Sequence, residues 1–405
     1  MRVFFLLICS AFLIGCSNEL GSLKTLQPKS DRPDFFKFNE FQIKQKVLYV
    51  PATPGTVKWG YLPNANDTPV ASMESGSYLV VDALSHEGIL EDQGRDPLSY
   101  FAGFGVKEKD VLNDAINIAI SNIDHDFHKD GPHVVIGPIE IKNTEPGDIL
   151  KIDIIDIVPR VAYGVISNRH GKGALPGEFP LGPKPDPTVK DDFKNVSIFS
   201  QTFTENNQVG AFIDDPSGKR IHFEAKPFMG IIGVAKDTGS PVHSVPPGKH
   251  GGNLDINELV AGSTLYIPVQ VPGAMFYTGD PHLAQGDGEV ALTALEQSLR
   301  ALFRINVIKK GSDSVLSRMA IESPFAETEE YWIPIGLNED LDIAMKNSVR
   351  QGINFISLKY GIQKQTALAY MSAATTFEVS QVVDKTKGIH GLIRKKDFVF
   401  PNEKN

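Results

Sequence analysis

The sequence is poor in cysteine and in long apolar runs. Its 405 residues include 2 cysteines, and beyond the N-terminus no run reaches the roughly 18 apolar residues that a membrane-spanning helix needs. The formal net charge is −9 without any long basic run, so nothing indicates a nucleic-acid partner. Internal repeats and a glycine-rich phosphate loop between a strand and a helix are also lacking. The remaining composition, 41% apolar and 22% charged, predicts a globular chain that is too long for one simple core.

The N-terminal residues have the pattern of a secretion signal. Arg2 precedes a largely apolar run over residues 3–14, and the small residue Gly15 stands directly before Cys16. This pattern indicates a bacterial lipoprotein leader that is cleaved before Cys16, whose sulfur then carries the lipid. An uncleaved N-terminal helix is the alternative, but it leaves the small residue unexplained. We therefore expect a lipid-anchored envelope protein, in the outer membrane or on the periplasmic face of the inner membrane, with no disulfide and no thiolate chemistry.

Hydrophobic periodicity predicts a mainly β protein with an α+β C-terminal part and a β-sandwich or barrel-like core. Alternating runs such as "ILKIDIIDIV" and "LRALFRINVI" have the length of strands, and "KDVLNDAINIAI" shows a helical stripe. Two further helices are expected at "NEDLDIAMKNSVRQGINFISLKYG", with an Asn cap, and at "QKQTALAYMSAA". The expected parts are a leader (1–15), a tether (16–40), an N-terminal β domain (41–163), an irregular connection that covers a site (164–220), a second β region with the site loops (221–310) and an α+β module (311–405).

Two glycine-rich loops carry most of the candidate chemistry. The stretch "GDPHLAQGDGE", residues 279–289, holds three carboxylates and a histidine, and "PPGKHGGNLD", residues 246–255, lies upstream of it. Because both loops stand at strand ends and are joined by one strand, we expect their side chains to share a rim. Glycines let such a backbone approach a substrate and adopt torsions that are closed to other residues.

Other histidines offer further candidates. Asp82 and His86 close the strand "YLVVDAL" and would converge if its end curls into a turn. The segment "NIDHDFHKDGPH" contains His125, His128 and His133, of which the first two are expected to be solvated loop residues.

These loops and the strands around them resemble a known family, the acetamidase/formamidase family, in which formamide and acetamide are hydrolysed. A lone "GDGE" is a weak signal, whereas a collinear series over roughly residues 45–395 is a strong one. The matching segments are "GTVKWG", "HVVIGPIEI", "EPGDILKIDIIDI", "PFMGIIGVA", "PPGKHGGNLDINELVAGSTLYIPVQVPGAMFYTGDPHLAQGDGEVALTALE" and "SQVVD".

The resemblance implies a β-rich, sandwich-like fold, an assembly of identical subunits and hydrolysis of a carboxamide C–N bond in a small amide. It also implies a bound divalent metal, zinc or calcium. Amide hydrolysis needs an activated water, stabilisation of the oxyanion and a proton for the leaving nitrogen. From residue type and placement we expect catalysis by Glu289, His282 and Asp280, metal binding by Asp82, His86, His133 and Asp255, and substrate binding by Asn253 and Gln285.

Structural roles compete with several of these assignments. Asp287 between two glycines, and Asp280 before a proline, have the positions of turn formers. Asp255 would otherwise serve as the N-cap of a helix at "INELV".

The chain also departs from the family pattern. In the segment Asn143 to Asp148, Asn143 and Thr144 stand where the family usually has Gly-Ala before Glu-Pro-Gly-Asp, and Glu140 stands where an apolar or aromatic residue is commoner. Together with the leader, these departures favour a larger or envelope-derived amide. A non-catalytic ligand-binding lipoprotein is the alternative from another class, and a metal-independent amidase using Glu289 with a backbone oxyanion hole is the third hypothesis.

Overall fold

The computed structural model describes residues 23–29, 37–38, 41–42, 47–186, 188–189, 191–205 and 208–399. The predicted leader and the lipid-bearing Cys16 lie outside these residues. Within the described part, no helix has both the length and the apolar character to cross a membrane.

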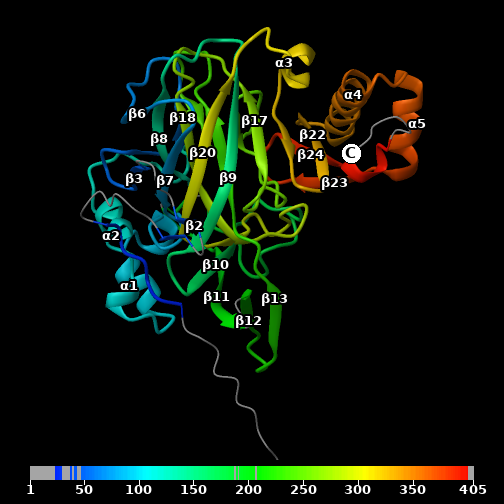
Figure 1. Cartoon of the computed structure of the whole chain (residues 1–405). Helices are drawn as coiled ribbons and strands as arrows, with labels where there is room; N and C mark the ends of the chain where they lie inside the picture. The colour runs from blue at the N-terminus through cyan, green and yellow to red at the C-terminus, as the bar shows by residue number, and fades with distance from the viewer. Residues whose placement is uncertain are drawn as a thin grey trace, which may run out of the picture.

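Two large sheets face each other around one hydrophobic core, with β20 and β9 in front of β18 and β8 in Figure 1. Alternation along "LRALFRINVI" places Ala301, Phe303 and Ile305 in this core, because successive side chains of a strand point to opposite faces. Phe303 packs edge-on against Phe276 of the opposite sheet, with ring centroids 5.9 Å apart. The predicted mainly β sandwich is confirmed, but the sheets stay open and do not close into a barrel.

The first sheet has 11 strands and provides much of the candidate site. In spatial order its strands are β13 (Arg220–Glu224), β12 (Gln208–Asp214), β11 (Val196–Glu205), β10 (Tyr163–Asn168), β19 (Leu295–Glu296), β18 (Phe276–Ala284), β14 (Phe228–Val234) and β16 (Gly251–Asn253), while β8 (Val134–Ile141) pairs with β18, β4 (Val57–Trp59) and β6 (Ala71–Met73).

The second sheet has 9 strands and continues into the C-terminal part. Its order is β23 (Thr376–Gln381), β24 (Lys387–Arg394), β22 (Tyr331–Asn338), β21 (Phe325–Glu327), β17 (Thr264–Pro268), β9 (Ile149–Pro159), β20 (Leu299–Ile308), β7 (Ser77–Ala83) and β3 (Val47–Pro51).

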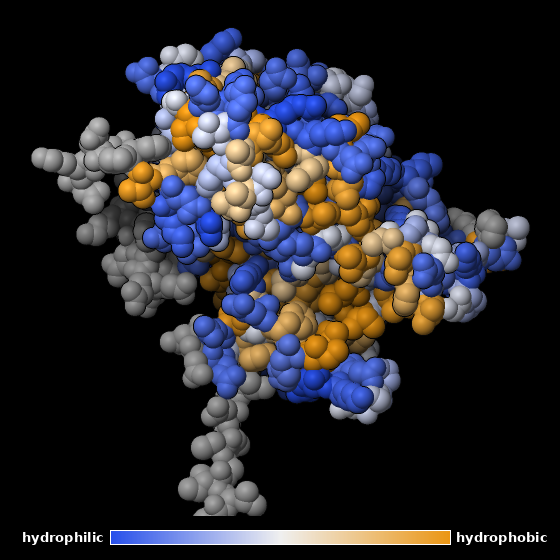
Figure 2. Space-filling model, turned by 90° about the vertical axis from the view of Figure 1, so that its right-hand side faces the viewer, coloured by the Kyte–Doolittle hydropathy of each residue, from blue (hydrophilic) through white to orange (hydrophobic). Residues whose placement is uncertain are grey.

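The helices are peripheral, and two of them lie beside β22 and β24 (Figure 1). Hydrophobic residues gather in the lower part of the face in Figure 2, interrupted by hydrophilic ones. The α-helices are α1 (Pro97–Ala102), α2 (Asn113–Ala119), α3 (Val315–Met319), α4 (Leu341–Tyr360) and α5 (Lys364–Ala374); the 3-10 helices are η1 (Glu91–Gln93), η2 (Glu108–Asp110) and η3 (Lys395–Asp397); and the small sheets pair β1 (Lys37–Phe38) with β2 (Phe41–Gln42) and β5 (Tyr61–Leu62) with β15 (Val242–His243).

Several local expectations were wrong. Residues 164–220, expected to be irregular, contain β11, β12 and most of β10, because their short apolar runs pair with one another in an antiparallel meander. The segment "INELV" forms turns and no helix, so Asp255 is not a helix cap. Helix α4 is capped by Asp340, which accepts the Ile343 N–H, whereas Asn338 instead caps the turn before it.

Candidate active site

Eight buried acids and imidazoles from distant parts of the chain meet beside a pocket of about 510 Å³. We call this set the acid–imidazole cluster. Its members are His86 after β7, His133 directly before β8, Asp255 after β16, Asp280 and His282 in β18, Glu289 in the loop after β18, Glu296 in β19 and Asp384 after β23.

Two histidines and one aspartate form the pocket-facing wall of the cluster. His86 Nδ1 lies 3.6 Å from Asp280 Oδ1, and His133 Nε2 lies 3.6 Å from Asp280 Oδ2. All three residues line the pocket and are buried. Each of the three offers one ligand atom, and these atoms lie within 4.8 Å of one another.

A second layer lies behind this wall. His282 Nε2 is 3.1 Å from Asp280 Oδ2 and 3.0 Å from Glu296 Oε1, and its Nδ1 is 3.8 Å from Asp255 Oδ1. The Gln285 side chain is the partner of His282 Nδ1 at 3.1 Å, and its amide N–H groups donate to the backbone oxygens of Asp255 and Ser380. Gln285 therefore orients His282.

The backbone is strained where it carries three of the carboxylates. Asp255, Asp280 and Glu289 have φ values of 48°, 53° and 48°, in the left-handed region that non-glycine residues rarely adopt. Such residues cost about 1–3 kcal/mol each and persist where the surrounding structure fixes them, commonly at functional sites. All three of these left-handed positions therefore carry acids of the cluster.

A glycine makes room for the cluster. A Cβ on Gly230 of β14 would lie 2.5 Å from Asp255 Oδ1, 2.7 Å from His282 Cε1 and 2.8 Å from Asp280 Oδ2. The Gly230 carbonyl also accepts the Leu254 N–H at 2.9 Å, which holds the backbone before Asp255. Any residue other than glycine at this position would therefore displace members of the cluster.

Crowding of like charges perturbs the acids. Burial and the neighbouring Glu289 carboxylate raise the pKa of Asp255 well above its usual range, and burial and Asp384 do the same to the pKa of Glu289. Burial also raises the pKa values of Glu296 and Asp384 to about 7. Only Asp280 moves the other way, because the imidazoles around it outweigh its burial and hold its pKa well below the usual range.

The imidazoles are perturbed in opposite directions. Burial lowers the pKa of His86, but its contacts with Asp280 and Glu87 outweigh burial and raise the pKa to about 10. Burial lowers the pKa of His133 to about 3, so this ring is neutral at pH 7. A neutral ring is the form that binds a metal ion.

Polar atoms without hydrogen bonds are concentrated in the cluster. Buried side-chain oxygens and nitrogens normally have partners, so an unsatisfied group needs an explanation such as an ion. Here the buried atoms without a hydrogen bond include both ring nitrogens of His86, both carboxylate oxygens of Asp255, Asp280 Oδ1, His282 Nε2, Glu289 Oε2, Glu296 Oε2, Asp384 Oδ2 and Asn253 Oδ1.

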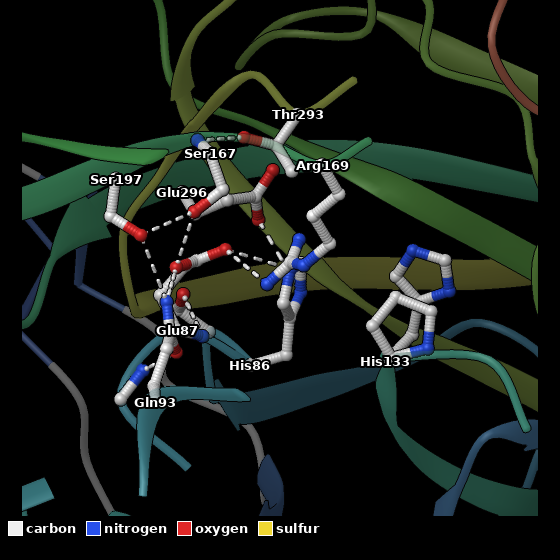
Figure 3. A network of polar contacts seen from close by, with 12 residues as sticks. His86, Glu87, Gln93, His133, Ser167, Arg169, Ser197, Thr293 and Glu296 are labelled. Atoms are coloured by element: carbon white, nitrogen blue, oxygen red, sulfur yellow. Dashed lines mark hydrogen bonds and ion pairs between the residues drawn. The ribbon is translucent and has the colours of Figure 1, made fainter. Parts of the chain in front are cut away.

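A network of buried charges fixes one side of His86 (Figure 3). Glu87 Oε1 lies 3.3 Å from His86 Nε2 and 3.4 Å from Arg169 Nη2, and its other oxygen accepts the Ser167 hydroxyl at 2.8 Å. The Arg169 Nε also donates to Asp92 Oδ2 at 2.9 Å. His86 is therefore held between a structural ion pair on one side and Asp280 on the other.

Two expected site residues have other roles. Asp82 was expected to bind metal, but its carboxylate accepts from Arg300 and from Tyr49, because Asp82 lies directly opposite Arg300 in the β7–β20 ladder. Gln285 was expected to bind substrate, but it orients His282 and does not line the pocket.

The remaining expected residues are divided between the pocket and the surface. Asn253 lines the pocket with its unpartnered oxygen, as a substrate-binding residue would. Asp287 points away toward Asn257, which donates to it at 3.2 Å. His125 was expected to be solvated but is buried, stacked on Trp59 and in contact with Glu91 at 3.0 Å, whereas His128 is exposed as expected; both line the pocket.

Sequence reasoning missed Glu296, Asp384 and the Glu87–Arg169 pair. Asp384 ends the matching segment "SQVVD", so a signal for it was present. Glu296 is in a two-residue strand, but it ends the long matching segment that closes with "GDGEVALTALE", so a signal for it was present as well.

Known amidases are similar in sequence to this chain. Residues 238–393 match the model of the Acetamidase/Formamidase family. A putative formamidase of Schizosaccharomyces pombe is 26% identical over 264 residues, covering 55% of this chain and 60% of that protein. The formamidase of Methylophilus methylotrophus is 24% identical over 344 residues, covering 72% of this chain and 81% of that protein. The chain is thus similar to the acetamidase/formamidase family, and its match spans about three-fifths of the fission-yeast relative.

Solved structures share the fold. The acetamidase of Bacillus halodurans superimposes with a TM-score of 0.64 at 23% identity, covering 86% of this chain and 98% of that chain. The acetamidase of Yersinia enterocolitica gives a TM-score of 0.66 at 21% identity, covering 88% and 94%.

Proposed function

We propose that the protein is an amidohydrolase that uses water to break the C–N bond of a carboxamide. The observation that supports this most is the placement of the unpartnered Glu289 oxygen in the same pocket as His86, His133 and Asp280. The similarity to this family supports the reaction class, since the relatives of this chain are named formamidase and acetamidase.

We propose that His86, His133 and Asp280 hold a divalent metal ion, whose binding would displace the proton that Asp280 and Glu87 stabilise on His86. Two ligand atoms at zinc-like bond lengths and a tetrahedral angle stand about 3.3 Å apart, and the two His–Asp separations of 3.6 Å come near this value. Donors of this kind suit zinc, and the unpartnered carboxylate oxygens behind them also suit calcium. When bound, such an ion polarises a carbonyl oxygen and lowers the pKa of water.

Glu289 is the proposed general base and then the acid. Glu289 lines the pocket, one of its carboxylate oxygens has no hydrogen-bond partner, and burial together with the Asp384 carboxylate raises its pKa, which favours taking a proton from water and passing it to the leaving nitrogen. A nearby cation would bring this raised pKa back toward neutrality. The reaction gives a carboxylate and ammonia or an amine.

Other residues position these groups. Asn253 Oδ1, buried and without a partner, is suited to accept a hydrogen bond from the substrate N–H. His282 and Asp255 lie behind Asp280 and Glu289 and are placed to fix their orientation.

The test compares two acids in one loop. Glu289→Gln should lower ammonia release from amides by at least about 10²-fold, the usual contribution of a general base. The matched control Asp287→Asn, two residues away and outside the pocket, should keep most of the activity. A chelator should abolish release, and zinc or calcium should restore it.

Each hypothesis predicts a different outcome in this test. Ammonia release that is unchanged by the chelator would favour the metal-independent amidase. A folded protein that releases ammonia from no amide would instead favour the ligand-binding lipoprotein.

We also propose that lipid on Cys16 anchors the protein in the cell envelope and that the enzyme is a homo-oligomer. Growth with labelled palmitate should label the wild type and not Cys16→Ala. Light scattering of the protein lacking residues 1–16 should give a mass above that of one chain.

A further inference from the structure

The pocket has a rim whose charge is opposite to that of its floor. The floor carries four acids of the cluster, whereas lysines from two separate segments reach the rim. Lys172 belongs to the segment after β10, and Lys385 belongs to the turn between β23 and β24. Both are exposed and line the same pocket.

These two lysines have no ion-pair partner within 4.0 Å among the described residues. The other basic side chains of the pocket are different, since Lys129 pairs with Asp126 at 2.6 Å and Arg169 pairs with Glu87 and Asp92. In a chain with a net charge of −9, two unpaired cations at one pocket are notable because acids are plentiful. Desolvation and the charges of Arg169 and Lys385 lower the pKa of Lys172.

Both lysines are attached to fixed backbone. The turn of Lys385 is built on the buried Gln381 side chain, which accepts the N–H groups of Val383 and Asp384 and donates to Thr386 O at 2.7 Å. Lys385 itself has a left-handed φ of 65° and directly follows Asp384 of the cluster.

The segment of Lys172 is bound to the loop that carries Glu289. The Ala174 N–H donates to Val290 O at 2.9 Å, and Gly173 leaves so little space that a Cβ there would lie 2.9 Å from Ala291 O. The backbone segments that carry the two lysines therefore keep a set position relative to the catalytic acids.

The size of the pocket exceeds what formamide or acetamide requires. Its volume of about 510 Å³ falls within the roughly 300–1,000 Å³ that enclose ligands of many atoms. A substrate that spans from the floor to the rim would place its carboxamide among the acids and its far end between the lysines. Asp130 also lines this pocket, but its carboxylate is occupied by the Tyr61 hydroxyl and the Asp126 N–H.

We propose that the substrates are primary amides that carry a carboxylate at the far end, and that Lys172 and Lys385 form the subsite for this carboxylate. This inference rests on the proposed amide hydrolysis at the floor. The bond that breaks is the C–N bond of the carboxamide, water supplies the new C–O bond, and the proton from water leaves with the nitrogen. The remote carboxylate is unchanged.

The test uses pairs of amides of equal length. Butyramide and succinamate each have three carbons beyond the amide carbonyl, and the last of them is a methyl group in butyramide and a carboxylate in succinamate. Glutaramate is longer than succinamate by one methylene group. We expect kcat/KM for the better of the two anionic amides to exceed that for the neutral amide of equal length. Lys172→Met and Lys385→Met should each lower kcat/KM for the anionic amide roughly threefold to fivefold, as for partly exposed ion pairs. Hydrolysis of butyramide should be unchanged, and added salt should weaken the preference.

Lys129→Met is the matched control, because this lysine lines the same pocket but is already paired with Asp126. It should leave the preference intact. Hydrolysis of neutral and anionic amides at equal rates, insensitive to both lysine variants, would overturn the subsite while leaving the amidohydrolase proposal in place.

Absence of hydrolysis for every amide would overturn the proposed function and the substrate class together. Calorimetry with succinate then tests the anion subsite by itself. Weaker binding by the double lysine variant than by the wild type and Lys129→Met would support the subsite, and equal binding by all three would reject it.

Discussion

Gly230 offers a test of the cluster that needs no substrate. In Gly230→Ala, the new methyl group would lie 2.5 Å from Asp255 Oδ1 and 2.8 Å from Asp280 Oδ2, where ordinary contact begins at 3.4 Å. The acids must therefore retreat by about 0.6–0.9 Å to reach ordinary contact. Overpacking of this kind costs about 1–3 kcal/mol of stability, and a displacement of about 1 Å in a catalytic group lowers activity by roughly 10²-fold.

Three measurements follow from this change. Thermal unfolding followed by circular dichroism should show a lower Tm, zinc or calcium should bind more weakly in calorimetry, and ammonia release should fall. Gly286→Ala is the control, because a Cβ there meets nothing within 4 Å and its backbone is not left-handed. A Gly230→Ala protein with wild-type Tm, metal affinity and activity would refute the cluster geometry.

Two further predictions concern residues outside the pocket. Asp82→Asn should lower the free energy of unfolding by about 3–5 kcal/mol, because it leaves the buried Arg300 guanidinium without its full partner; denaturant unfolding measures this, and activity per folded molecule should be unchanged. Burial lowers the pKa of His390, but Glu258 and Glu378 outweigh burial and raise it to about 9. The contribution of His390 to the free energy of unfolding should therefore be full below about pH 6.5 and lost as the pH rises through about 9. Across this window the Tm of the wild type should fall more steeply than that of His390→Gln. Parallel curves of Tm against pH would contradict the assignment.

The strands of the core were predictable because their periodicity is a local property. The runs "ILKIDIIDIV" and "LRALFRINVI" correspond to β9 and β20 almost residue by residue, since alternation of apolar side chains directly reflects one buried face. Helix α4 also ends at Gly361 as predicted, in the left-handed conformation that glycine permits.

The site was only partly predictable because its assembly depends on long-range pairing. Asp384 reaches the cluster through β23 and the bridge between Gly288 and Gln381, which joins segments about a hundred residues apart in the chain. Asp82 is the opposite case, because it is close to His86 in sequence but does not join the cluster. Its partner is Arg300, which lies directly opposite it in the β7–β20 ladder.

The members of the cluster are spread from residue 86 to residue 384, so dividing the gene would separate them. Fragments cut at the expected boundaries 163, 220 or 310 would each carry an incomplete set, because His86 and His133 precede the first cut and Asp384 follows the last. Expressed alone, no fragment cut at 163 or 220 should bind the proposed metal ion, because either cut separates His86 and His133 from Asp280. Co-expressed halves should regain that property only where their strands re-pair, which makes metal capture a reporter of correct reassembly.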